Sequence, residues 1–277
     1  MPELPEVEHV RQGIYSRLKD RRISKVETYV PRLREPLEQD QCNSWQKGSP
    51  IVDVRRRGKY LILVLDDDKA VLIHLGMSGQ LIVINPDLPP KRHERVRWYL
   101  SGDLSCRFLD QRRFGLVQNC TVDRNTLLPP ELDHLGPEPL SDNFNADYLG
   151  KICSRFRSSV KTVLLNQRVV AGLGNIYVNE ALFRSGVRPD RSIRSLKPNE
   201  QSRLIREIRA VLREAIAHRG TTFRDYRDAD GTPGGYAAQL KVYGKEHTAC
   251  PRCTGDIRIR RFVQEGRSSY TCPACQR

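Results

Sequence analysis

The first residues of the chain include types that can act as a nucleophile. The sequence begins MPELPEVEHV, which places Pro2, Glu3 and Glu6 directly behind Met1. Aminopeptidases normally remove a methionine that precedes proline, so we expect Pro2 to carry the free amino group. A free α-amino group has a pKa of about 7.7 to 8.0, so a useful fraction of this secondary amine is neutral near pH 7. Its attack on an aldehydic carbon gives an iminium ion, an electron sink that promotes elimination.

The two glutamates add proton transfer to this chemistry. Glu3 is adjacent to Pro2, and Glu6 lies about one helical turn further on, so either carboxyl group can protonate a leaving group. The same residues also suit an ordinary helix start, because Pro and Glu are favoured in the first turn and a negative charge is stabilised there. The residues alone therefore leave catalysis and simple helix initiation both open.

The carboxyl-terminal part contains two pairs of closely spaced cysteines. The pairs read CPRC at 250–253 and CPAC at 272–275, with 18 residues between them. Two such knuckles supply the four sulfurs of a tetrahedral zinc; two disulfides or an iron–sulfur cluster are the alternatives. Four protein ligands leave no open position, so we expect one structural Zn²⁺ and no metal catalysis. The expected ligands are Cys250, Cys253, Cys272 and Cys275.

The elements that must position these groups differ between the two halves of the chain. Apolar residues at helical spacing predict a helix over 4–18, and short apolar runs between turns over 22–119 predict a β-sandwich or barrel. Residues 121–145 are rich in Pro and Asp and predict a linker. Helical spacing then returns over 175–186, where Gly186 closes a short predicted helix with Pro189 just beyond it, and most clearly over 197–220. The Gly- and Asp-rich segment 221–240 predicts a long loop.

The net charge of +14 is confined to the second half of the chain. Residues 1–150 hold 22 basic and 22 acidic side chains, whereas residues 151–277 hold 25 basic and 11 acidic ones. A basic half favours a polyanionic partner such as nucleic acid, although a soluble protein of high pI without such a partner has the same composition. No apolar stretch reaches membrane-spanning length and no secretory signal is visible, so we expect a cytoplasmic protein without a membrane partner.

Several motifs occur together and in a fixed order. They are MPELPEVE at the start, HLGMSG at 74–79, DQRRFG at 110–115, GLGNIYVNEALF at 172–183 and the two cysteine pairs. In this combination the chain closely resembles the bacterial formamidopyrimidine-DNA glycosylases, which are 8-oxoguanine DNA glycosylases and AP lyases, over residues 2–277. The resemblance implies a monomer that binds damaged double-stranded DNA in a basic cleft between two domains and flips the damaged nucleotide out of the stack.

The implied fold is α+β with two domains. The amino-terminal domain is a β-sandwich with flanking helices, and the carboxyl-terminal domain is helical, with a helix–two-turn–helix motif and a four-cysteine zinc finger. On this sequence the expected boundaries are 1–120 for the sandwich, 121–145 for the linker, 146–243 for the helix–two-turn–helix domain and 244–277 for the zinc finger.

The resemblance also implies roles for individual residues. Pro2 attacks C1′ and expels the base with Glu3 as the acid, after which β- and δ-elimination nick the strand on both sides; Glu6 is a second active-site carboxylate of undefined role. Lys59, Asn175 and Arg267 resemble the residues that hold phosphate near the lesion, and Lys161 is a further phosphate candidate.

A second group of residues resembles those that contact the bases. Met77 fills the hole left by the flipped nucleotide, Arg113 pairs with the orphaned base and Phe114 wedges into the stack. Arg112 and His93 are expected to contact DNA as well. Thr221, Thr222 and Tyr236 are candidates to read the flipped base from the 221–240 loop.

Two departures from the family pattern and two rival interpretations remain. Gln111 stands where many members have proline, and the spacing between the cysteine pairs is longer than in some relatives. An endonuclease VIII-like glycosylase for oxidised pyrimidines shares the proline chemistry and the zinc finger, although Leu4 and the Gly-rich loop favour the purine enzyme. A non-catalytic zinc-ribbon DNA-binding protein explains the charge and the cysteines but does not need Pro2 or Glu3.

Overall fold

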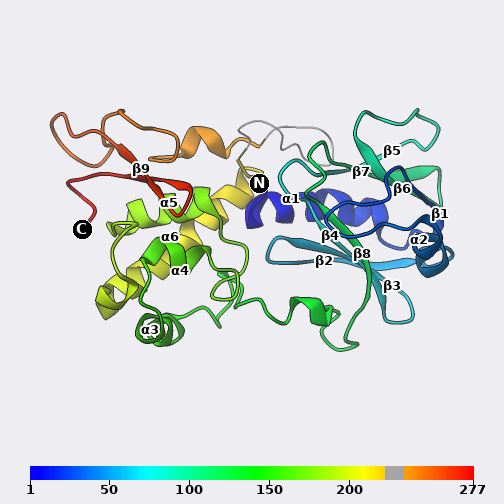
Figure 1. Ribbon diagram of the computed structural model, residues 1–277, viewed down its shortest axis with the longest axis horizontal. Helices are drawn as coiled ribbons and strands as arrows, with labels where there is room; N and C mark the ends of the chain where they lie inside the picture. Colours follow the sequence, from blue (N-terminus) through cyan, green and yellow to red (C-terminus); the bar gives the residue numbers. More distant parts are fainter. Residues whose placement is uncertain (222–233) are drawn as a thin grey trace. The chain divides into compact units, whose positions relative to one another are not determined.

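A computed structural model describes residues 1–221 and 234–277 (Figure 1). The chain divides into two compact units. The first comprises Met1–Asp133 and His218–Ala237, and the second comprises His134–Ala217 and Ala238–Arg277. The boundary at 133–134 falls inside the segment 121–145. The described residues 218–221 and 234–237 belong to the first unit, whereas the expected domain was 146–243. The Thr221 backbone N–H donates to the Glu6 carboxylate of that unit.

The first unit is a sandwich of two four-stranded antiparallel sheets. One sheet has the order β1-β6-β7-β5, with bounds Ile23–Thr28, Glu94–Leu100, Leu104–Leu109 and Gln80–Ile84. The other has the order β2-β3-β4-β8, with bounds Ile51–Arg57, Tyr60–Leu65, Lys69–His74 and Leu116–Thr121. The short helices α2 (Gln39–Gln46) and η1 (Pro130–Leu132) complete this unit together with α1 (Leu4–Leu18). The expectation of a β-sandwich with flanking helices is confirmed.

The core of the first unit joins α1 to both sheets. Val7, Val10, Ile14 and Leu18 repeat at helical spacing on α1 and are completely buried. They belong to one cluster with alternate residues of the strands, such as Leu61 of β3 and Trp98 of β6. Because α1 packs against β2, the amino terminus of the chain is held by the core rather than left as a tail.

The second unit is helical and carries a zinc-finger-like hairpin. Its helices are α3 (Ala146–Arg155), α4 (Val160–Leu165), α5 (Asn175–Ser185), η2 (Ile193–Ser195) and α6 (Pro198–Ala217), followed by η3 (Tyr236–Gln239), which begins in the first unit. Asn145 and Ser159 cap α3 and α4 by accepting backbone N–H groups. Gly186 ends α5 in the left-handed conformation, at the position predicted from the sequence.

The hairpin consists of β9 (Arg260–Gln264) and β10 (Arg267–Thr271). Gln264 pairs with Arg267, so only Glu265 and Gly266 form the turn, both with positive φ angles of 48° and 71°. This is the geometry of a tight two-residue hairpin turn. Within the described residues, none of the helices has the length and apolar character that a membrane span requires.

Candidate functional site

The amino terminus forms a reciprocal cap on helix α1. Glu3 is the residue before the helix, and its backbone N–H donates to Glu6 Oε2 at 2.8 Å while its side chain accepts the backbone N–H of Glu6. Pro2 is buried, and the exposed fractions of Glu3 and Glu6 are only 3% and 2%. Met1, by contrast, is half exposed, with 51% of its surface accessible. The structure therefore fixes the Pro2–Glu3 segment and leaves Met1 outside it.

Glu6 also holds the start of the 221–240 loop. Its other carboxylate oxygen, Oε1, accepts the backbone N–H of Thr221 at 2.7 Å. Gly220 has a φ angle of +76°, and a Cβ there would lie 2.8 Å from Glu6 Oε1, so the close approach requires glycine. The sequence left the role of Glu6 open, and no local pattern indicated a partner 215 residues away.

The two ends of this loop are joined within the first unit. Tyr236 N–H donates to the Gly220 carbonyl at 3.0 Å, and Gly235 N–H donates to the His218 carbonyl at 3.0 Å. Tyr236 is completely buried beside the ring of His218. Thr222, the third loop candidate, lies outside the described residues.

Lys59 lies in the tight turn between β2 and β3, and only 6% of its surface is exposed. The adjacent Tyr60 ring contacts His74 at the end of β4 edge to face, at 4.8 Å between centroids. Burial, together with the charges of Arg34 and Lys59, lowers the pKa of His74 to about 3. His74 is therefore neutral at physiological pH. No role was predicted for this residue from the sequence.

Met77 and Phe114 project from two neighbouring loops of the first unit. Their exposed fractions are 38% and 50%, high values for large apolar side chains. A Cβ on Gly76 would lie 2.5 Å from the backbone of Phe114, so the two loops touch through their main chains. The Arg112 guanidinium lies 4.9 Å from the centre of the Phe114 ring, within the range of a cation–π contact.

Asp110 ties these two loops together. Its Oδ1 accepts the Ser78 hydroxyl at 2.6 Å, and its Oδ2 accepts the Gly115 N–H at 2.8 Å. Arg113, between these anchors, is exposed and has a left-handed φ of 57°. His93 is connected to the same loop because its carbonyl accepts the Asp110 N–H at 2.9 Å. The structure therefore brings Met77, Arg112, Arg113, Phe114 and His93 into one region.

In the second unit, Lys161 and Asn175 converge on the β9–β10 hairpin. Lys161 Nζ donates to the Ser268 carbonyl and to Ser269 Oγ, both at 2.7 Å, and Asn175 Nδ2 donates to the same Ser268 carbonyl at 3.1 Å. Burial and the nearby charge of Arg267 lower the pKa of Lys161 to about 8. Both side chains therefore hold the backbone directly beside Arg267.

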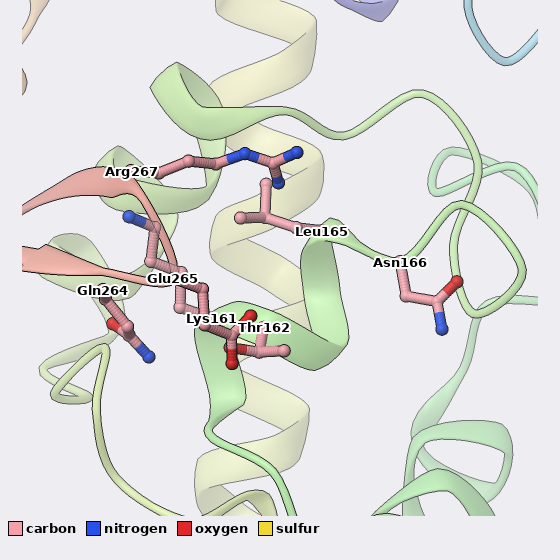
Figure 2. Close-up of a pocket in the computed structure, with 7 residues that line it drawn as sticks. All are labelled: Lys161, Thr162, Leu165, Asn166, Gln264, Glu265 and Arg267. Atoms are coloured by element: carbon pink, nitrogen blue, oxygen red, sulfur yellow. The ribbon is translucent and has the colours of Figure 1, made fainter.

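A hollow of about 160 Å³ lies next to this junction (Figure 2). Its walls come from α4, the residue that follows it and the hairpin turn, and they comprise Lys161, Thr162, Leu165, Asn166, Gln264, Glu265 and Arg267. Arg267 is exposed at its rim. Thr162 Oγ1 donates to Glu265 Oε1 at 2.9 Å, which fastens the hairpin turn to α4.

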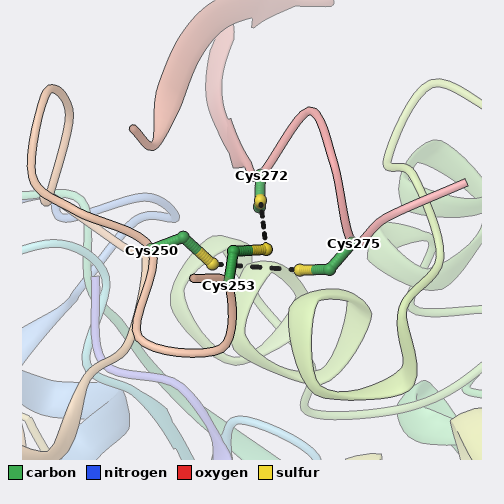
Figure 3. Close-up of side chains that lie close together, drawn as sticks. All are labelled: Cys250, Cys253, Cys272 and Cys275. Atoms are coloured by element: carbon green, nitrogen blue, oxygen red, sulfur yellow. Dashed lines mark hydrogen bonds between the residues drawn. The ribbon is translucent and has the colours of Figure 1, made fainter. Parts of the chain in front are cut away.

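The four expected metal ligands form one cluster (Figure 3). Their sulfur atoms all lie within 4.8 Å of one another, with Cys250 and Cys275 at 3.9 Å and Cys253 and Cys272 at 3.6 Å. Four sulfurs at about 2.3 Å from a tetrahedral ion are about 3.8 Å apart, so the cluster has the dimensions of a four-thiolate metal site. These residues can therefore bind a metal ion.

Glu180 anchors the segment that leads into this cluster. It is completely buried on α5, and its carboxylate accepts the backbone N–H groups of Lys241, Val242 and Tyr243, each at 2.9 Å. Its role was not predicted from the sequence. The available signal was an acidic residue within the apolar stretch of a predicted helix, which requires buried partners.

Comparison with known proteins agrees with this arrangement. The family model of the formamidopyrimidine-DNA glycosylase N-terminal domain matches residues 1–117, and that of the formamidopyrimidine-DNA glycosylase H2TH domain matches residues 135–227. A formamidopyrimidine-DNA glycosylase of Hahella chejuensis is 42% identical over 277 residues, covering 100% of both chains.

Solved structures give the same result. MutM (Fpg) from Thermus thermophilus superposes with a TM-score of 0.86 at 37% identity, covering 99% of this chain and 98% of that one. A structure of MutM in complex with DNA that contains carbocyclic 8-oxo-G has a TM-score of 0.89 at 31% identity and covers 100% of both chains. The chain therefore belongs to the formamidopyrimidine-DNA glycosylase family.

Proposed function

We propose that this chain is a bifunctional DNA glycosylase and AP lyase of base excision repair that removes oxidised purines, 8-oxoguanine and formamidopyrimidines, from double-stranded DNA. It would act as a monomer in the cytoplasm, where the chromosome is accessible. The relative solved with 8-oxo-G DNA supports the choice of purines over oxidised pyrimidines. Family membership makes a non-catalytic zinc-ribbon protein the weaker interpretation.

The observation that carries the proposal is the cap at the start of α1. Glu3 and Glu6 accept each other's backbone N–H groups, and Glu6 also accepts Thr221 N–H. These contacts fix the backbone on which Pro2 is placed. A nucleophile reacts faster when its position is fixed before the substrate binds, because the loss of its conformational entropy then does not add to the activation barrier.

In the proposed reaction, the Pro2 nitrogen forms a bond to C1′ of the flipped nucleotide. The bond between C1′ and the base breaks, and the base leaves with a proton supplied by the Glu3 carboxyl group. The C1′–O4′ bond then breaks, O4′ takes up a proton and the Pro2 nitrogen loses its N–H proton, which gives an iminium ion. Loss of a C2′ proton breaks the C3′–O bond and releases the 3′ phosphate, and loss of a C4′ proton breaks the C5′–O bond and releases the 5′ phosphate.

The remaining candidates serve to bind and distort the DNA. Lys59, Asn175 and Arg267 would hold phosphates, Met77 and Phe114 would occupy the stack, and Arg113 would pair with the orphaned base. In this scheme Lys161 acts mainly on the hairpin, because its Nζ already donates to Ser268 and Ser269.

A zinc ion in the cysteine cluster would stabilise the hairpin that carries Arg267. The four thiol groups suit Zn²⁺, and β9 and β10 are too small to form a core alone. When bound, the ion supplies folding energy and no open coordination position.

Borohydride trapping on duplex DNA with 8-oxoguanine opposite cytosine tests the mechanism. The protein without Met1, checked by intact mass, should form a covalent adduct, and Pro2→Gly should lose it. Pro5→Ala is the matched control, since it removes a proline from the same segment and should trap normally. Equal trapping by Pro2→Gly and the wild type would reject Pro2 as the nucleophile.

Thymine glycol duplex, assayed in parallel, tests the substrate class. We expect faster excision of 8-oxoguanine under single-turnover conditions. Faster excision of thymine glycol would instead assign the chain to oxidised pyrimidines.

A further inference from the structure

Arg34 lies beside the two loops that carry Met77 and Phe114. Its guanidinium nitrogen Nη2 donates to the Phe114 carbonyl at 2.8 Å and lies 3.2 Å from His74 Nδ1. Its backbone N–H donates to the Gly115 carbonyl at 3.0 Å. Arg34 therefore contacts the end of β4, which leads into the Met77 loop, and the main chain that carries Phe114.

His74 extends this connection to the Met77 loop. Its Nδ1 accepts the backbone N–H of Gly76 at 2.9 Å, so the proton of the neutral imidazole lies on Nε2. Gly76 itself is in main-chain contact with Phe114. Arg34, His74, Gly76 and Phe114 thus form a closed ring of contacts at the base of the two exposed apolar side chains.

The segment that carries Arg34 is itself firmly anchored. Leu33 and Leu37 on either side are 7% and 3% exposed and belong to the core of the first unit. The backbone between them turns tightly, with Leu33 N–H donating to the Glu35 carbonyl at 3.0 Å. The Arg34 side chain therefore connects the two loops to a segment that is itself held by the core of the first unit.

The geometry points to Arg34 as a positioning residue for base flipping, which holds the Met77 and Phe114 loops as one wedge through the Phe114 carbonyl and His74. This inference rests on the proposed function, because it requires the wedge to enter DNA. It goes further by assigning a role to a side chain outside the residues expected to touch the lesion. Such support favours insertion of the wedge into DNA. Ordering a loop on binding costs conformational entropy, and loops that are already ordered avoid this cost.

An exposed arginine can also bind a phosphate directly, and the two roles give different results. Loss of a phosphate contact weakens binding to all DNA and lowers the salt dependence of binding by about one charge. Loss of a brace slows insertion of the wedge and leaves the salt dependence unchanged. Lysine separates the two roles, since it keeps the charge but lacks the planar guanidinium group.

The test uses the full chain with Arg34→Met, Arg34→Lys and the matched control Arg32→Met. Arg32 lies two residues away, is exposed, and has no side-chain hydrogen bond or ion pair among the described residues. Stopped-flow fluorescence of 2-aminopurine placed beside 8-oxoguanine reports unstacking. Excision is measured in single turnovers, and strand cleavage of single-stranded abasic DNA reports chemistry that needs no wedge.

We expect both Arg34 variants to unstack and excise about tenfold more slowly or worse, as for the loss of a charged hydrogen bond, with an unchanged salt slope. Cleavage of single-stranded abasic DNA and all properties of Arg32→Met should match the wild type. The inference would be overturned if Arg34→Lys unstacked and excised at wild-type rates while Arg34→Met showed a lower salt dependence of binding. It would also be overturned if the Arg34 variants lost the same activity on single-stranded abasic DNA as on the 8-oxoguanine duplex. Absence of excision by the wild type would instead reject the proposed function.

Discussion

Glu6→Gln should separate the chemistry of this protein from its DNA binding. In the wild type both carboxylate oxygens accept backbone N–H groups, from Glu3 at 2.8 Å and from Thr221 at 2.7 Å. Glutamine offers one carbonyl oxygen and one NH₂ group, so one of the two backbone N–H groups must face another donor. The site is 2% exposed, which leaves little access for water to replace the lost acceptor.

The cost follows from these contacts. A hydrogen bond to a charged group contributes about 1.5–3 kcal/mol, so the loss of one such bond should cost about 2 kcal/mol. If that energy normally holds the Pro2–Glu3 segment in its reactive position, excision and borohydride trapping should both fall by about 30-fold. The melting temperature should fall by about 4–8 °C. Affinity for a duplex with a tetrahydrofuran abasic analogue should change by less than about threefold, because neither oxygen of Glu6 is expected to touch DNA.

Glu8→Gln is the control on the same helix. Glu8 accepts hydrogen bonds from Arg11 and Arg56, and these bonds do not involve Glu3 or Thr221. Its replacement should lower stability but leave single-turnover excision near the wild-type rate. If Glu6→Gln excises at the wild-type rate, or if Glu8→Gln loses as much activity as Glu6→Gln, then the cap does not position the nucleophile.

Three further predictions concern the metal, acid stability and the buried carboxylate of α5. Chelation of the metal from the cysteine cluster should weaken abasic-duplex affinity in fluorescence anisotropy about tenfold before it affects trapping at saturating DNA; equal affinity with and without metal would contradict this. His74 has its pKa lowered to about 3. Between about pH 6.5 and pH 3 the unfolded chain therefore binds more protons than the folded chain. The free energy of unfolding should decrease as the pH is lowered through this range, by up to about 1.4 kcal/mol per pH unit. His74→Asn should flatten that slope in urea titrations, and an unchanged slope would remove His74 as its cause. Glu180→Gln places an NH₂ group against a buried backbone N–H and should destabilise the second unit by about 1–3 kcal/mol. The variant should therefore release its metal at a lower urea concentration than the wild type. Release at the same urea concentration would exclude this role of Glu180.

Local patterns in the sequence predicted several of the elements that carry the site. The helical spacing of Val7, Val10 and Ile14 predicted α1, and Gly186 with Pro189 after it predicted the end of α5. The short apolar runs predicted the sandwich, which is confirmed. Helix α2 was not predicted, because only Cys42 and Gln46 of its eight residues are buried and its apolar periodicity is weak.

The contacts within the candidate site could not be predicted in the same way. Glu6 and Thr221 are 215 residues apart, Arg34 and Phe114 are 80 apart, and Lys161 and Ser268 are 107 apart. Such pairs depend on tertiary topology, and a single sequence contains no local signal for them. The motif resemblance supplied the residues expected to touch DNA, but not the residues that hold them.

This distinction has a mechanistic consequence for both units. In each unit a charged or polar side chain binds a backbone group beside an expected DNA contact: Arg34 binds the Phe114 carbonyl, and Lys161 binds the Ser268 carbonyl next to Arg267. Each such bond is already made in the free protein, so DNA does not have to order the loop or the hairpin when it binds. Substitution of these residues should therefore alter the rates of flipping and excision more than the affinity for undamaged DNA, whereas substitution of Arg267 should weaken binding to all sequences.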